Sequence, residues 1–154
     1  MITVLFVGAV ALWLLLNWLA PFATLARAER MPLGRVPIEL VAVARQHRAR
    51  LYVAPLVRLG GYSVLAWPWR LVIFDREFFT RASGAQVRFL IAHELGHCAL
   101  GHLEHRWLAT VSGTVLLPAV RRRLDAMERE ADDFARQLTG ITPREFYQLK
   151  GDGA

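Results

Sequence analysis

Residues 83–102 read SGAQVRFLIAHELGHCALGH, and this stretch decides the predicted fold. Ser83, followed three residues later by Gln86, forms the capping-box pattern that opens a helix. Apolar residues then surround almost the whole helix, which is typical of a buried central helix. Gly101 stands where a glycine commonly ends a helix. We therefore expect one central helix, ending near residue 100, around which the rest of the domain packs.

Two histidines and a glutamate interrupt this apolar helix within HELGH, residues 93–97. His93 and His97 are four residues apart, so both imidazoles leave the same face of the helix. Burying these groups with Glu94 is costly unless something binds them. Two neutral imidazoles can hold Zn²⁺, which lowers the pKa of a bound water towards 7, and a neighbouring carboxylate can take the proton of that water. The motif predicts His93 and His97 as ligands of one catalytic zinc ion and Glu94 as its general base.

A catalytic zinc of this kind needs a third protein ligand and an open position. A histidine six residues after His97 would complete one extended pattern, but leucine occupies that position. A second long helix, expected over residues 119–138, offers carboxylates instead. Glu128 lies on the border of the apolar stripe of this helix, so the helical phase favours Glu128 over Glu130, which is expected to be a solvated charge. Asp132, one turn further on, is expected to accept a hydrogen bond from the free ring N–H of a ligand histidine.

The remaining segments predict an α+β domain. A helix is expected from residue 38 to about 46, and a short terminal helix from about residue 142. A strand is expected at residues 51–53. Residues 62–66 and 71–74 are rich in β-branched and aromatic side chains, which predicts a hairpin around a turn at residues 67–69.

The N-terminal segment carries no charged residue from Ile2 to Ala26. Its densest apolar part, Ile2–Ala20, is long enough as a helix to cross a bilayer core of roughly 30 Å. Arginines at positions 27, 30 and 35 follow, and the positive-inside rule then places the body of the protein in the cytoplasm. A cleaved signal peptide is the alternative, disfavoured because no basic segment precedes the apolar run. We expect a transmembrane anchor at residues 1–26, a linker at 27–36 and a zinc domain at 37–150, in a single-pass protein of the cell membrane.

The composition is compatible with this organisation. The chain has 154 residues, 55% of them hydrophobic, a mean hydropathy of +0.30, and 19 Lys+Arg against 13 Asp+Glu. The excess positive charge is expected to face the lipid bilayer, and no nucleic-acid-binding motif occurs, so no nucleic acid partner is expected. The single cysteine, Cys98, excludes an internal disulfide. Residues 107–120 form a second apolar run that is too short for a confident span.

Two motifs together give the chain a resemblance to a known family. FLIAHELGHCALGH at residues 89–102 and EREADDFA at 128–135 resemble gluzincin-type zinc metallopeptidases, most closely the membrane family of HtpX and the CAAX prenyl proteases. The Glu-x-x-Ala-Asp pattern of that family falls on Glu128, Ala131 and Asp132. The resemblance implies a zincin-like metalloprotease domain, with a small antiparallel sheet and active-site helices, behind one N-terminal transmembrane helix. It also implies that an edge strand before the histidine helix, here residues 62–66, holds the substrate by strand addition.

The function implied is a membrane-anchored zinc endopeptidase that cleaves unfolded or membrane-protein segments, as in membrane protein quality control. The second motif also resembles the soluble ImmA/IrrE-type peptidases, which act on one specific partner. A third alternative is a membrane scaffold that keeps zinc only for folding. A peptidase also needs a donor that stabilises the oxyanion, and the sequence leaves Tyr62, His102 and Tyr147 open for that role.

Overall fold

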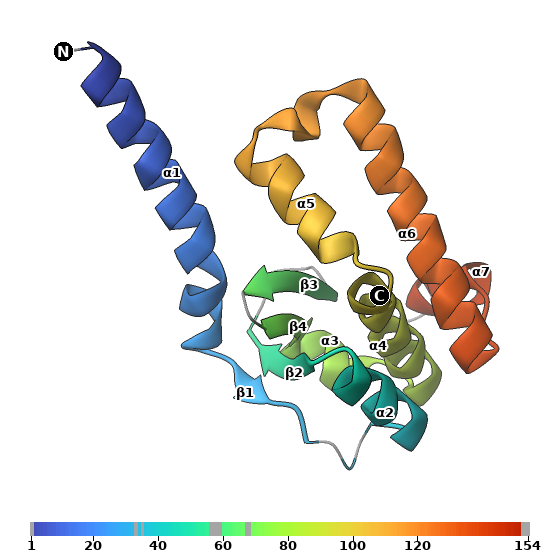
Figure 1. Ribbon diagram of the computed structural model, residues 1–154. Helices are drawn as coiled ribbons and strands as arrows, with labels where there is room; N and C mark the ends of the chain where they lie inside the picture. The colour runs from blue at the N-terminus through green and yellow to red at the C-terminus, as the bar shows by residue number, and fades with distance from the viewer. Residues whose placement is uncertain (1, 33, 35, 56–59, 67–68, 152–154) are drawn as a thin grey trace.

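The computed structural model describes residues 2–32, 34, 36–55, 60–66 and 69–151 (Figure 1). Its order along the chain is α1 (Ile2–Leu25), β1 (Glu29–Arg30), α2 (Ile38–Gln46), β2 (Ala49–Ala54), β3 (Gly61–Ala66), β4 (Trp69–Asp75), α3 (Arg76–Arg81), α4 (Gly84–Ala99), α5 (His102–Val111), the 3₁₀ turn η2 (Thr114–Leu116), α6 (Pro118–Thr139) and α7 (Pro143–Gly151). The architecture is α+β, with one four-stranded sheet and helices on both of its faces.

The sheet is mixed, which corrects the expected antiparallel sheet. Its strand order is β1-β2-β4-β3. The hairpin of β3 and β4 is confirmed, with Tyr62 opposite Ile73, although residues 67–68 of its predicted turn lie outside the described residues. β4 also pairs in parallel with β2. In chain order, β3 forms first at the edge of the sheet and β4 then lies between β2 and β3. The apolar pattern of a sequence identifies strands but does not determine which strands are neighbours.

Helix α4 is the central helix that the sequence predicts, and its capping box is confirmed. The Ser83 hydroxyl accepts from the backbone N–H of Gln86 at 3.3 Å, and the Gln86 side chain accepts from the backbone N–H of Ser83 at 2.8 Å. The helix ends at Ala99, and Gly101 follows with a positive φ of 72°. α4 packs against β3 and β4 on one side and against α6 on the other.

The strands alternate their side chains between two hydrophobic cores. The larger core lies between the sheet and α2, α4 and α7, and it includes Leu51, Val53, Val72, Phe74 and Phe89. The smaller core lies on the opposite face of the sheet, where the C-terminal end of α1 covers Ala54, Ala66, Leu71 and Ile73. Because β4 is buried on both faces, residues 71–74 form an unbroken apolar run.

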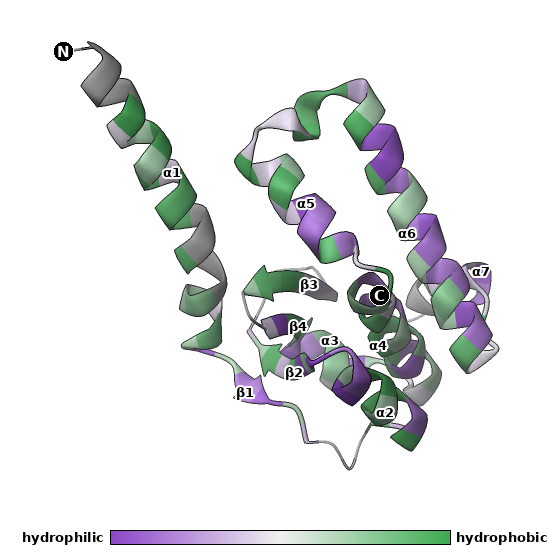
Figure 2. Cartoon of the chain, in the orientation of Figure 1, coloured by the Kyte–Doolittle hydropathy of each residue, from purple (hydrophilic) through white to green (hydrophobic). Residues whose placement is uncertain are grey.

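The N-terminal helix corrects the predicted membrane anchor. Within the described part of the chain, no helix is both long and apolar enough to cross a membrane. The side chains described in α1 (Ile2–Leu25) include those of residues 7–16. Figure 2 shows that these residues are largely hydrophobic. The finding contradicts the transmembrane helix predicted at residues 1–26 and the single-pass location in the cell membrane.

Other elements were not predicted from the sequence. The segment expected as a linker, residues 27–36, contributes β1, in which Glu29 pairs with Val53 and Arg30 with Tyr52. Positions 33 and 35 of that segment lie outside the described residues. The short helix α3 is capped by Asp75, whose carboxylate accepts from the backbone N–H of Phe78. Helix α5 follows α4 after Leu100 and Gly101, and the apolar run at residues 107–120 is divided among α5, η2 and the start of α6.

Contact between α4 and α6 places the two sequence motifs side by side, and Gly96 makes this contact close. A Cβ atom at Gly96 would lie 3.2 Å from the Phe134 ring and 3.3 Å from the Cα atom of Ala131. The buried residues of α6, Met127, Ala131 and Ala135, form the stripe that faces inward. The small residues at 96 and 131 therefore set the distance between the helices that carry the candidate site.

Replacing Gly96 with valine is expected to destabilise the protein by about 1–3 kcal/mol, because the added atoms meet the backbone of α6 at Ala131 as well as the side chain of Phe134. Chemical denaturation of the metal-free protein measures this. Gly96→Ala is the matched control, since its single methyl group crowds α6 less and gains about 1 kcal/mol of helix propensity. A Gly96→Val protein as stable as the wild type would show that the helices do not depend on this close approach.

Candidate metal centre

Three side chains from α4 and α6 converge on one point. His93, His97 and Glu128 each offer one ligand atom, and these atoms lie within 4.8 Å of one another. The Nε2 atoms of His93 and His97 are 3.3 Å apart, and Oε2 of Glu128 lies 3.4 Å from the first and 3.5 Å from the second. The sequence predicts these three residues as ligands, and we call them the triad. They form the one group of this kind among the described residues.

The triangle of donor atoms has the dimensions of one face of a coordination tetrahedron. Around an ion with metal–ligand distances of about 2.0–2.1 Å, tetrahedral donors lie about 3.3–3.4 Å apart. The three edges of 3.3, 3.4 and 3.5 Å agree with that spacing. The donor set of two imidazoles and one carboxylate therefore fits a small tetrahedral cation and leaves a fourth position for a non-protein ligand.

An arginine contact holds the Glu128 carboxylate from the other side. Its Oε1 atom accepts from the Arg106 guanidinium of α5 at 2.9 Å, so only Oε2 faces the histidines. The hydrogen bonds to His93 and His97, together with the charge of Arg106, hold the pKa of the Glu128 carboxyl well below its usual range. The carboxylate is thus ionised and oriented, and Arg106 is a site residue that the sequence analysis did not identify.

Asp132 takes the place predicted for it behind His93. Nδ1 of His93 lies 2.9 Å from Oδ1 of Asp132, so the ring N–H donates to the carboxylate and Nε2 faces the triad. Burial opposes protonation of His93, but the hydrogen bonds to Asp132 and Glu128 and the charge of Glu94 outweigh it and raise the pKa of His93 from 6.5 to about 9. In the metal-free protein at neutral pH this imidazole is protonated.

This raised pKa predicts a pH dependence of stability in the presence of a chelator. Below pH 6.5 both the folded and the unfolded chain carry the His93 proton, and its contacts contribute fully. As the pH rises towards about 9, the folded protein must give that proton up and the contribution is lost. The melting temperature of the metal-free protein is therefore expected to fall between these pH values, and to fall less in His93→Gln. A melting temperature that is flat or rises over this interval would contradict the assignment.

His102 lies behind His97 rather than at the surface of the site. It is 2% exposed, and its Nδ1 atom lies 3.0 Å from Nδ1 of His97, on the side of the ring away from the triad. Its Nε2–H donates to Oε2 of Glu130 at 3.0 Å, and Arg123 donates to the other oxygen at 3.1 Å. Burial lowers the pKa of His102. The structure thus removes His102 from the candidates for substrate or oxyanion contact, and it corrects the expectation that Glu130 is only solvated.

Glu94 lines a cavity of about 200 Å³ together with two of the three ligand residues, His93 and Glu128. The polar wall of this cavity is formed by His93, Glu94, Glu128, Asp132 and Tyr147, and the remaining wall by Gly60, Gly61, Phe78, Phe89, Leu90 and Phe146. Phe146 of α7 stacks on Phe89 of α4 with ring centroids 4.7 Å apart, which fixes the apolar wall beside His93. The buried carboxylate of Glu94 therefore lies beside the candidate ligands His93 and Glu128 and beside an apolar wall.

The two tyrosines proposed from the sequence lie in different places. Tyr147 lines the cavity, and partial burial with the charges of Asp132 and Glu128 raises the pKa of its hydroxyl, which keeps the O–H available as a donor. Tyr62 packs against the smaller core on the opposite face of the sheet. Tyr62 therefore does not reach the triad, and Tyr147 remains from the three candidates for oxyanion contact.

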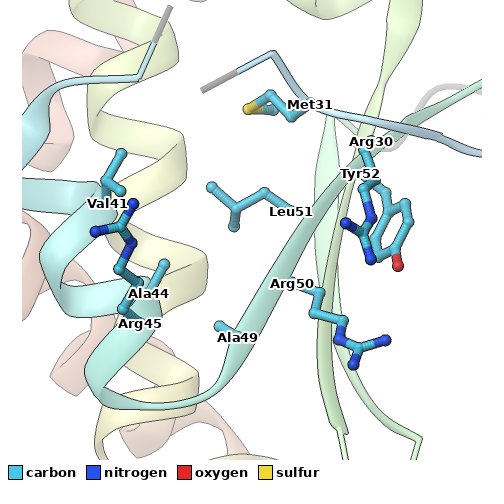
Figure 3. A pocket seen from close by; sticks show the side chains of 9 residues that line it. All are labelled: Arg30, Met31, Val41, Ala44, Arg45, Ala49, Arg50, Leu51 and Tyr52. Atoms are coloured by element: carbon cyan, nitrogen blue, oxygen red, sulfur yellow. The ribbon is translucent and has the colours of Figure 1, made fainter. Parts of the chain in front are cut away.

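A second cavity carries no comparable chemistry. It has a volume of about 230 Å³ and lies between α2 and the strands β1 and β2. Figure 3 shows Met31, Val41 and Leu51 directed towards one another across it, with Arg50 pointing away. Its described lining residues include three arginines and a tyrosine but no His, Cys, Asp or Glu. Of these two cavities, the one at α4 is lined by His93, Glu94 and Glu128.

Comparison with known proteins does not assign the chain to a family. No family model matches the sequence, and no curated protein shows significant similarity to it. The resemblance to the HtpX family therefore stays a prediction that rests on the two motifs.

Proposed function

We propose that the protein is a zinc-dependent endopeptidase whose metal is held by His93, His97 and Glu128. The observation that carries the proposal is the triangle of donor atoms, with edges of 3.3–3.5 Å, beside a buried glutamate in one cavity. Two imidazoles and a carboxylate with an open fourth position are typical of catalytic rather than structural zinc. A site kept only for folding has no need of Glu94.

The chain's own residues then have separate roles. Glu94 takes a proton from the attacking water and later delivers it to the leaving amine as the C–N bond breaks. Asp132 keeps the Nδ1 proton of His93, so that Nε2 stays free for the metal. Tyr147 donates its hydroxyl hydrogen to the oxygen on which negative charge develops. When bound, zinc supplies the Lewis acidity that polarises the water and the scissile carbonyl.

The apolar wall of the cavity suggests the kind of side chain that the substrate presents. Phe78, Phe89, Leu90 and Phe146 face the same recess as Glu94. A recess of about 200 Å³ admits one large side chain, and the apolar wall opposite the polar one offers contacts to an apolar side chain. We expect cleavage next to Leu, Phe or Met in an extended, unfolded polypeptide.

The proposal is tested by incubating the purified, zinc-loaded protein with a reduced and alkylated test protein and sequencing the fragments by mass spectrometry. Cleavage that stops on chelation, returns with added Zn²⁺ and clusters at large apolar residues is the expected result. Cleavage that survives chelation would reject the role of the metal. No cleavage of any unfolded protein by the zinc-loaded form would reject a general endopeptidase.

A further inference from the structure

We propose that Glu130 and His102 form a relay that fixes which nitrogen of His97 is free to bind metal, which makes both of them positioning residues. The inference rests on the proposed function for its purpose, because it assigns a role behind the same metal ligand. Its evidence is a series of two contacts. Nδ1 of His97 lies 3.0 Å from Nδ1 of His102, and Nε2 of His102 lies 3.0 Å from Oε2 of Glu130.

The position of the metal site determines which ring nitrogen carries the hydrogen, first in His97 and then in His102. Nε2 of His97 faces His93 and Glu128, so a metal ligand at this position needs its lone pair there and its hydrogen on Nδ1. That Nδ1–H points at Nδ1 of His102, which must therefore be the bare nitrogen that accepts it. The hydrogen of His102 is then on Nε2 and requires an acceptor.

Glu130 is that acceptor. An ionised carboxylate can only accept, and its Oε2 atom lies 3.0 Å from Nε2 of His102. The bond holds the His102 hydrogen on Nε2 and leaves Nδ1 bare. Arg123 donates to Oε1 at 3.1 Å, which keeps the carboxylate turned towards His102. If His102 carried its hydrogen on Nδ1 instead, His97 would direct an N–H at the metal position and could not bind.

Burial of both rings protects the hydrogen bond between His97 and His102 from water. His97 is 1% exposed and His102 is 2% exposed, so water does not compete for the bond between their Nδ1 atoms. His93 has the equivalent support directly from Asp132. Both ligand histidines are thus connected to a carboxylate of α6, one directly and one through a second imidazole.

The turn between α4 and α5 brings His102 into contact with His97. On a continuous helix, His102 would lie on a different face from His97, because five residues correspond to about 500° of rotation. Gly101 has a φ of 72°, which L residues with a side chain rarely adopt, and it turns the chain between the two helices. His102 then starts α5 with its ring against that of His97, at a centroid distance of 5.2 Å.

The first test measures zinc affinity by competition with a chromophoric chelator. His102→Phe retains the size of the ring without an acceptor and is expected to weaken zinc binding by about 10–100-fold. His102→Gln offers an amide oxygen to the Nδ1–H of His97 and is expected to recover most of the loss. Glu130→Ala, which alters a partly exposed residue, is expected to weaken binding by about 10-fold. Asp133→Ala on the same helix is the matched control, with unchanged affinity.

The second test reads the tautomer without zinc and without activity. Nitrogen-15 NMR of the metal-free wild type is expected to show His97 with hydrogen on Nδ1, and Glu130→Ala to show a mixture of both tautomers. Wild-type affinity in both Glu130→Ala and His102→Phe, or a His97 tautomer unchanged by Glu130→Ala, would overturn the relay. A protein that has the predicted tautomer and cleaves nothing would reject the proposed function while leaving the relay in place.

Discussion

Glu94→Gln is expected to lower peptidase turnover by about 10²–10⁴-fold and to leave zinc binding unchanged. Glutamine has the shape of glutamate but does not take a proton from water at neutral pH. Glu94 lines the cavity without belonging to the group of three ligand atoms, so its replacement removes the base and retains the metal. Turnover is measured by the release of fragments from an unfolded test protein, and zinc by elemental analysis of the same sample.

The matched control is Glu104→Gln. Glu104 lies on α5 and accepts from Arg70 at 2.6 Å, and it does not line the cavity of the triad. This variant is expected to cleave at the wild-type rate. A Glu94→Gln protein that keeps more than about a tenth of wild-type turnover would contradict the general-base role.

The second large effect is expected for Glu128→Ala, which should weaken zinc binding by more than about 100-fold. Residues behind the ligands typically change metal affinity by about 10–100-fold, and a direct ligand should exceed that range. Oε2 of Glu128 closes the triangle with the two histidines, and no other described carboxylate belongs to that group. The affinity is measured by the same chelator competition.

The comparison with Glu130→Ala distinguishes a ligand from a supporting residue. Glu130 is separated from the triad by His102, so its loss should have the smaller effect. If Glu130→Ala weakened zinc binding more than Glu128→Ala did, the assignment of the third ligand would be wrong.

The sequence was informative where spacing within one helix determined the geometry. His93 and His97 share a face of α4 because they are four residues apart, and Glu128 and Asp132 share a face of α6 for the same reason. The phase of Glu128 against the apolar stripe of α6 was enough to select it over Glu130. The structure brings all four of these side chains together.

The sequence was less informative where geometry depends on how the chain turns between elements. The sequence left His102 open as an oxyanion contact, but the chain turns at Gly101 and His102 lies behind His97 instead. The contact of Arg106 with Glu128 joins residues from two helices, and periodicity within either helix does not reveal it. The mixed sheet and the strand β1 were missed because a pair of polar residues has no strand periodicity and strand order is not encoded in apolar alternation.

The N-terminal prediction failed for a different reason. It depended on the length of an uncharged run and on the arginines that follow. Among the described residues no helix satisfies both the length and the apolarity that a span requires. In the described structure, the C-terminal end of α1 packs on the smaller core through Phe22 and Leu25, so part of the uncharged run serves the domain itself.

The central claim is that two histidines and one carboxylate hold a single zinc ion and leave one position open. X-ray absorption at the zinc edge of the zinc-loaded protein tests it most directly. We predict two imidazole ligands and two oxygen ligands, one of which disappears in Glu128→Ala while the other exchanges with added inhibitor anions. Four protein ligands in a closed site, or a sulfur ligand from Cys98, would contradict the claim and indicate a structural metal instead.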